Sequence, residues 1–134
     1  MLKKITALGL ILVMVFTVNC LPASAAEDAI TYLYTRKCSS ELSITSLNAS
    51  CTSYLSGYYG TTTKIDVTQT LQVRDGNQWR KSSAWSATYY NYYCTFTNSR
   101  TVYSGNQYRV KSEFKVYSGS NYETITVYSD PVWT

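Results

Sequence analysis

Hydrophobic and polar residues alternate with a period of two along most of the chain from residue 42 onward, a pattern typical of half-buried β-strands. The clearest run is 64–74, in which Ile65, Val67, Leu71 and Val73 share one face and polar side chains take the other. Similar runs occur at 42–45, 49–55, 108–116 and 124–128. Ser, Thr, Tyr, Val and Asn dominate these segments, and this composition favours strands and turns over helices.

Turn sequences separate the predicted strands at 45–48, 56–63, 75–78 and 118–121. The pair Asp75-Gly76 indicates a hairpin, because it readily supplies the positive φ angles of a tight turn. The segment 79–87 is irregular, which predicts an edge strand or a strand with a β-bulge. About seven short strands with turns every ten residues or so predict an all-β fold, an immunoglobulin-like antiparallel sandwich of two sheets.

Four tyrosines lie within residues 89–93. If 86–98 is one strand, Tyr90, Tyr92, Cys94 and Phe96 face the core, and the residues between them face solvent. Tyr108 begins a later strand just after the corner sequence 104–107, where it resembles the tyrosine corner of immunoglobulin-like domains, whose hydroxyl bonds back to the backbone of the corner. We therefore expect Tyr90, Tyr92 and Tyr108 to serve packing.

From Leu42 onward the chain resembles a group of small exported proteins of Gram-positive bacteria whose function is not assigned. The motifs that carry the resemblance are "ASC", "TTTKI…TLQ", "W…SAW" and "YRVKSEFKVYSG…ET", and they extend over most of the predicted domain. None of them carries known chemistry. The resemblance therefore implies a fold and an extracellular location, but no site residues.

The first 26 residues have the pattern of a secretory signal peptide. Lys3 and Lys4 precede an apolar segment at 5–16, and Ala23-Ser24-Ala25 fits the small-residue cleavage site. Cleavage after Ala25 or Ala26 leaves 27–134 as a single secreted domain without a transmembrane segment. Two of the twelve Lys and Arg residues, Lys3 and Lys4, lie in the leader. The domain therefore keeps ten Lys and Arg against eight Asp and Glu, a net charge of about +2. This positive charge is too small to favour nucleic acid as a partner.

Three cysteines remain after the predicted cleavage, namely Cys38, Cys51 and Cys94. Export favours disulfide formation. Cys51 and Cys94 both fall on predicted core faces, and the second and fifth strands are neighbours in an immunoglobulin-like order, so a Cys51–Cys94 bridge is possible. A bridge to Cys38 and three reduced thiols are the alternatives.

The chain has no histidine, which removes the usual general base, the usual catalytic triads and the common zinc sites. The carboxylates that a glycosidase pair would need are Asp66, Glu113, Glu123 and Asp130, and we expect Asp66 and Glu113 to be solvated strand charges. No phosphate-binding loop, nucleophile elbow or calcium loop is present in the sequence. We therefore predict a protein that is not an enzyme and has no cofactor, metal or catalytic residues.

All fourteen tyrosines belong to the predicted domain, on a background of Ser, Thr, Asn and Gly that is typical of binding surfaces. Tyr58 and Tyr59 lie in a loop between two glycines, where strand packing does not account for them, and they are the candidate binding residues. These features predict a secreted, non-catalytic binding module whose partner is a cell-wall glycan or a surface protein. The alternative is a secreted effector of toxin-like or bacteriocin-like type, which usually travels with an immunity or transport partner encoded beside it.

Overall fold

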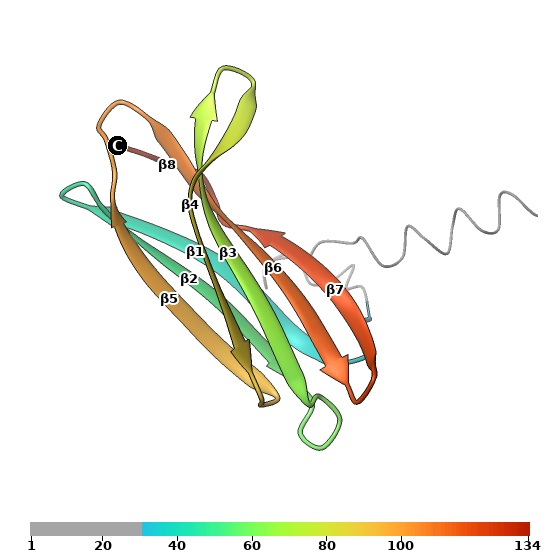
Figure 1. The fold of residues 1–134 in the computed structure, drawn as a ribbon. Coiled ribbons are helices and arrows are strands. Elements are labelled where there is room, and N and C mark those ends of the chain that lie inside the picture. Colours follow the sequence, from blue (N-terminus) through green and yellow to red (C-terminus); the bar gives the residue numbers. More distant parts are fainter. Residues whose placement is uncertain (1–30) are drawn as a thin grey trace, which may run out of the picture.

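The computed structural model describes residues 31–134, which form eight β-strands (Figure 1). The predicted leader lies outside the described residues. The strands are β1 (Thr35–Thr45), β2 (Asn48–Gly57), β3 (Lys64–Asp75), β4 (Gln78–Tyr89), β5 (Tyr93–Thr101), β6 (Gln107–Ser118), β7 (Asn121–Tyr128) and the short β8 (Val132–Trp133).

The strands form two antiparallel sheets packed face to face, so the predicted sandwich is confirmed. The smaller sheet has the order β1-β2-β5, and the larger has the order β4-β3-β6-β7, with β8 paired to β6. The second and fifth strands are neighbours, as the predicted order requires. The chain enters the larger sheet at β3, returns to the smaller sheet at β5 and crosses again at β6.

The core between the sheets is divided into two apolar clusters. One contains Leu55, Ile65 and Phe114, together with Val116 and Ile125. The other contains Ala49, Cys51, Leu71, Tyr108 and Val110, among others. Both clusters draw on alternate residues of the same strands, which is why the period-two pattern of the sequence predicted most of their members; Cys38 and Val102 lie outside the predicted runs.

A layer of polar side chains separates the two clusters. Ser53 lies on β2 between Leu55 and Cys51, and Gln69 lies on β3 between Val67 and Leu71. Ser53, Gln69 and Ser112 are completely buried, each with 0% of its surface exposed. Buried polar groups are costly unless they are hydrogen-bonded, so the partners of this layer decide whether it stabilises the fold.

The layer is satisfied by a continuous chain of hydrogen bonds. Gln69 Nε2 donates to Ser53 Oγ at 2.8 Å and to the Phe96 carbonyl at 2.9 Å, while its Oε1 accepts from Asn98 Nδ2 at 3.0 Å. Ser53 Oγ lies 2.6 Å from Ser112 Oγ, and Ser112 donates to Ser40 Oγ at 2.8 Å. Since Ser112 uses its hydrogen on Ser40, Ser53 donates to Ser112. The chain joins side chains of five strands from both sheets.

Replacing Gln69 with Ala should lower the free energy of unfolding by about 3 kcal/mol, because it opens a cavity and removes the three buried hydrogen bonds that Gln69 makes with Ser53, Asn98 and the Phe96 carbonyl. Urea denaturation followed by tyrosine and tryptophan fluorescence measures the change. Gln78→Ala, at an exposed position of β4, is the matched control and should shift stability by less than about 0.5 kcal/mol. Equal losses in the two variants would contradict a stabilising layer.

β4 is both an edge strand and a bulged strand, the two possibilities that the irregular sequence predicted. It pairs only with β3, and the register shifts between Leu71 and Gln72, opposite Ser83 and Lys81. One extra residue reverses the face that every later side chain takes. Trp85 therefore packs against the core, whereas Trp79 lies on the outer face beside Arg109, whose guanidinium carbon is 4.4 Å from the centre of the Trp79 ring.

Tyr108 forms the predicted tyrosine corner. Its side chain is buried at the start of β6, and its hydroxyl accepts a hydrogen bond from the backbone N–H of Tyr103 at 3.0 Å. The same hydroxyl lies 3.4 Å from the Tyr103 carbonyl, to which it donates. The bonds fix the connection between β5 and β6.

Tyr108→Phe keeps the ring but removes the hydroxyl, so it should lower the free energy of unfolding by about 0.5–1.5 kcal/mol. Tyr103→Phe is the control, since its side chain is 80% exposed. Thermal denaturation of the two variants beside the unchanged protein compares them. An unaltered melting temperature for Tyr108→Phe would show that the corner bond contributes nothing.

Candidate functional site: a tyrosine-rich end of the sandwich

Three connections meet at one end of the sandwich: the β2–β3 loop at 58–63, the β4–β5 connection at 90–92 and the β6–β7 turn at 119–120 (Figure 1). Hydrogen bonds join them to one another. Gly57 N donates to the Tyr92 carbonyl at 2.6 Å, and Thr63 N donates to the Tyr117 carbonyl at 2.8 Å. Gly119 N donates to Thr63 Oγ1 at 3.0 Å. The three connections therefore form one continuous surface.

The β2–β3 loop is shaped by a buried threonine. Thr62 Oγ1 accepts from Tyr58 N at 3.0 Å and donates to the Tyr34 carbonyl, while the Tyr58 carbonyl accepts from the N–H groups of Thr61 and Thr62. A Cβ atom at Gly57 would lie 2.3 Å from Thr62 Oγ1, so only glycine allows this approach. The loop is thus closed on its inner side, and its tyrosines project outward.

Both candidate binding residues are exposed on this loop. Tyr59 is 86% exposed and Tyr58 is 39% exposed. The ring of Tyr59 meets the ring of Tyr92 edge to face, with centroids 5.4 Å apart, and Tyr92 meets Tyr93 in the same way at 5.1 Å. The loop that the sequence singled out therefore joins the tyrosine run at 89–93.

The prediction that Tyr90 belongs to the core is wrong. β4 ends at Tyr89 and β5 begins at Tyr93, so the chain crosses between the sheets at 90–92 and the alternation is broken there. Tyr90 is 82% exposed, and Tyr92 is half-buried rather than in the core. Tyr89 packs inward instead, with its ring 6.3 Å from that of Phe96. Asn91, a common turn residue in the middle of the run, was the signal for this break.

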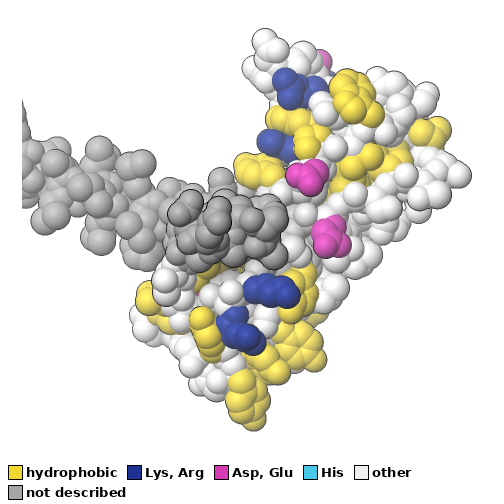
Figure 2. All heavy atoms as spheres, turned by 180° about the vertical axis from the view of Figure 1, so that it is seen from behind, with side chains coloured by type: hydrophobic (Ala, Val, Ile, Leu, Met, Phe, Trp, Pro, Cys, Tyr) yellow, Lys and Arg dark blue, Asp and Glu magenta, His cyan; other side chains and the backbone are white. Residues whose placement is uncertain are grey.

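We define the tyrosine end as the exposed or half-buried tyrosines at this pole: Tyr58, Tyr59, Tyr90, Tyr92, Tyr93, Tyr117 and Tyr122. Two lysines border it, with Lys64 Nζ 4.1 Å from the Tyr117 ring centre and Lys115 Nζ 4.1 Å from the Tyr122 ring centre. A hydrogen bond with Tyr117 raises the pKa of Lys115. In Figure 2, hydrophobic side chains gather at the lower end of the molecule beside basic ones.

The predicted Cys51–Cys94 disulfide is not found. Both residues are free and buried, so no bridge joins any two of Cys38, Cys51 and Cys94. The two strands are neighbours, but Cys51 pairs with Asn98 and Cys94 pairs with Leu55. This offset of four residues separates the sulfurs by roughly 13 Å along the strands, well beyond disulfide reach. They also belong to different apolar clusters, on opposite sides of the polar layer.

Cys51 and Cys94 should resist alkylation in the folded protein. Burial raises the pKa of both thiols to about 11 from an ordinary value of 9.0, so at pH 8 they stay protonated, and only the thiolate reacts. With iodoacetamide at pH 8 we expect both to react at least roughly 100-fold more slowly than in urea. A mass-spectrometric time course measures this. A disulfide-linked Cys51–Cys94 peptide, or labelling at the unfolded rate, would contradict it.

Asp66 and Glu113 lie on the outer face of the larger sheet, as predicted. They line one hollow of about 460 Å³ and sit on neighbouring strands, since Asp66 pairs with Lys115 and Glu113 pairs with Thr68. This diagonal placement puts their Cα atoms roughly 7–8 Å apart. Asp66 accepts a hydrogen bond from Thr88 Oγ1 at 2.7 Å, and Glu113 lies 3.9 Å from Lys111 Nζ. Both carboxylates thus have partners on the surface of the sheet.

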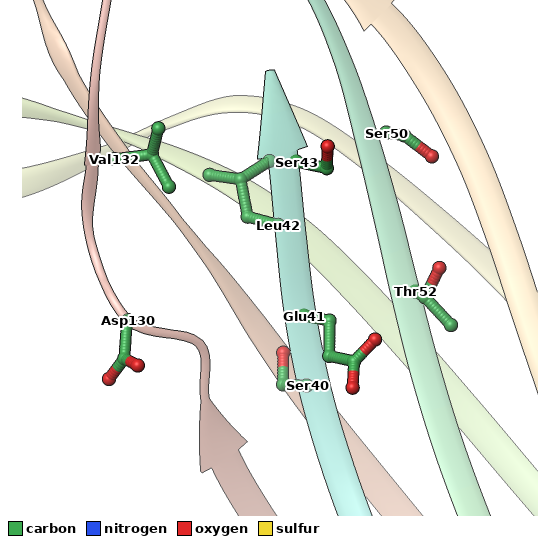
Figure 3. Close-up of a pocket in the computed structure, with 8 residues that line it drawn as sticks. All are labelled: Ser40, Glu41, Leu42, Ser43, Ser50, Thr52, Asp130 and Val132. Atoms are coloured by element: carbon green, nitrogen blue, oxygen red, sulfur yellow. The ribbon is translucent and has the colours of Figure 1, made fainter. Parts of the chain in front are cut away.

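The other two candidate carboxylates lie apart from this pair. Glu123 is buried at 6% exposure and accepts hydrogen bonds from the N–H groups of Leu33 at 2.9 Å and Tyr34 at 3.0 Å, so it anchors the start of the described chain. Asp130 borders a second hollow of about 330 Å³ (Figure 3). There the Asp130 carboxylate points away from Glu41, which lies on the other side of β1 beside Thr52.

The chain between residues 31 and 134 holds no group of three or more His, Cys, Asp or Glu side chains that could ligate a metal ion. It also contains no helix long and apolar enough to cross a membrane.

Comparison with known proteins assigns no family. No family model matches the chain, and no curated protein matches it. Among solved structures, the solution structure of CsgH from R. palustris is similar with a TM-score of 0.42 and 12% sequence identity, covering 68% of this chain and 87% of CsgH. A likeness this low carries no argument about function. The resemblance to small exported Gram-positive proteins stays a prediction.

Proposed function

We propose that the protein is a small exported binding module that has no catalytic activity of its own and binds its partner through the tyrosine end. The observation that carries this proposal is the meeting of three hydrogen-bonded connections that present Tyr59 and Tyr90, 86% and 82% exposed, on the same surface as Tyr58 and Tyr93. Exposed aromatic clusters of this kind mark interaction sites more often than solvated surface.

Tyrosine suits such a surface because its ring offers a large contact area and its side chain has few torsions to immobilise. The edge-to-face contacts of Tyr92 with Tyr59 and Tyr93 further restrict these rings before any partner arrives. The surrounding loop residues are Ser, Thr, Gly and Asn, which supply adaptable hydrogen bonds. A pre-ordered surface loses little conformational entropy on binding.

The partner classes that fit this surface are a cell-wall glycan and a surface protein. Tyrosine faces stack on sugar rings, and Lys64 and Lys115 at the border can reach acidic groups of either partner. The proposed location outside the cell rests on the signal-peptide pattern of residues 1–26. The absence of histidine and the surface partners of Asp66 and Glu113 support a non-catalytic role.

Replacing Tyr58 and Tyr59 together with Ser should abolish binding, because interface tyrosines commonly carry much of the binding energy. The free energy of unfolding should change by less than about 0.5 kcal/mol, since both side chains lie outside the core. The assay is a screen of cell-wall glycans and envelope extracts against the purified protein, followed by titration of each hit.

Tyr103→Ser is the matched control for this test. Tyr103 is 80% exposed and lies at the opposite end of the sandwich, in the connection between β5 and β6. It should keep both stability and binding. If the double variant unfolds several degrees early while binding persists, these two tyrosines serve packing and the proposal fails.

A further inference from the structure

Among the described residues, the edge strands are β1 and β5 in the smaller sheet and β4, β7 and the two-residue β8 in the larger. An edge strand exposes a row of backbone N–H and C=O groups that can pair with another strand. Proteins that remain monomeric usually interrupt such edges with charges, bulges, short strands or a covering segment.

The long edge strands other than β5 carry interruptions of this kind. β1 has a register shift between Thr35 and Lys37, next to two adjacent cations. β4 has the bulge at Ser82 and the cations Arg80 and Lys81. β7 is partly covered, because Glu123 near its start accepts hydrogen bonds from the backbone N–H groups of residues 33 and 34.

β5 has no bulge, and no segment among residues 31–134 pairs with its outer edge. It runs for nine residues without a register shift against β2, and Arg100 near its end is its one charged residue. Because Gly57 N donates to the Tyr92 carbonyl, Cys94 and every second residue after it turn their backbone groups toward β2. The backbone groups of the remaining residues point to the open edge: Tyr93, Thr95, Thr97, Ser99 and Thr101. The Thr95 carbonyl accepts a long hydrogen bond from the Tyr89 hydroxyl at 3.4 Å.

We propose that β5 pairs antiparallel with β5 of a second copy of the chain, about a two-fold axis at Thr97. This register is self-complementary: Thr97 faces Thr97, Thr95 faces Ser99, and Tyr93 faces Thr101. All of these positions carry hydroxyl side chains, and cross-strand Thr and Ser pairs stabilise sheets. The axis places Arg100 opposite Cys94 rather than opposite the second Arg100, so no like charges face each other. A two-fold axis also closes the assembly at two copies.

The pairing joins the two small sheets into one of six strands, and it has a consequence for binding that rests on the proposed function. Since the paired strands run in opposite directions, Tyr93 of one copy lies beside Thr101 of the other. The two tyrosine ends therefore point to opposite poles of the dimer. Such a dimer connects two separate ligand-bearing surfaces, because its two binding sites cannot contact the same surface together. An interface of one strand pair is small, so the dimer forms at high concentration and dissociates on dilution.

Sedimentation velocity of the purified protein over a range from micromolar to millimolar tests the pairing. We expect the weight-average mass to double across the series. Thr97→Pro should abolish this increase, because it removes the N–H at the centre of the proposed interface, and proline is tolerated on edge strands where that N–H faces solvent. Thr97→Lys provides a second variant, which places two like charges face to face on the axis.

The control is Ser43→Lys, which adds the same charge to an exposed position of the β1 edge and should dimerise like the unchanged protein. Circular dichroism verifies that each variant is folded. A constant monomer mass at every concentration overturns the proposal, and so does a dimer that persists in both folded Thr97 variants. The double Tyr58, Tyr59 variant separates the two ideas: it should dimerise normally even if the tyrosine end binds nothing.

Discussion

The chain of hydrogen bonds through the middle of the core is the interaction on which the rest of the structure depends. It passes from Asn98 to Gln69, Ser53, Ser112 and Ser40, and so joins side chains of both sheets. Apolar contacts between sheets are non-directional and tolerate sliding. Hydrogen bonds in a dry core do not, because a shift would leave buried groups without partners. The layer therefore fixes how the two sheets lie on each other.

The relative position of the two sheets also determines which connections lie side by side at each end of the sandwich. At one end, β2 stops at Gly57 and β5 starts at Tyr93, which brings the loop at 58–63 against the connection at 90–92. At the other end, the Tyr108 hydroxyl holds the connection between β5 and β6. The exposed tyrosines thus stand on backbone that hydrogen bonds between the connections hold in place.

The same division of the core explains the cysteines. Cys51 and Cys94 belong to clusters on either side of the polar layer, and each acts as a small apolar side chain. Stability in this sandwich comes from packing and from the hydrogen-bonded layer, without a bridge between these two strands. The protein thereby differs from antibody domains, in which a disulfide joins the two sheets.

The sequence by itself indicated most of the strands, the two-sheet class, the irregular edge strand β4 and the tyrosine corner, because each depends largely on residues that are close along the chain. Alternation reveals which face of a strand a side chain takes. It did not reveal the polar layer: Gln69 stands within the apolar face of 64–74, and only the structure shows it buried there with its partners. The tertiary structure alone decided the offset of Cys51 from Cys94, the outward turn of Trp79 and the exposure of Tyr90. These depend on the register between distant strands and on where the chain leaves one sheet for the other. Alternation along a single strand carries no information about either.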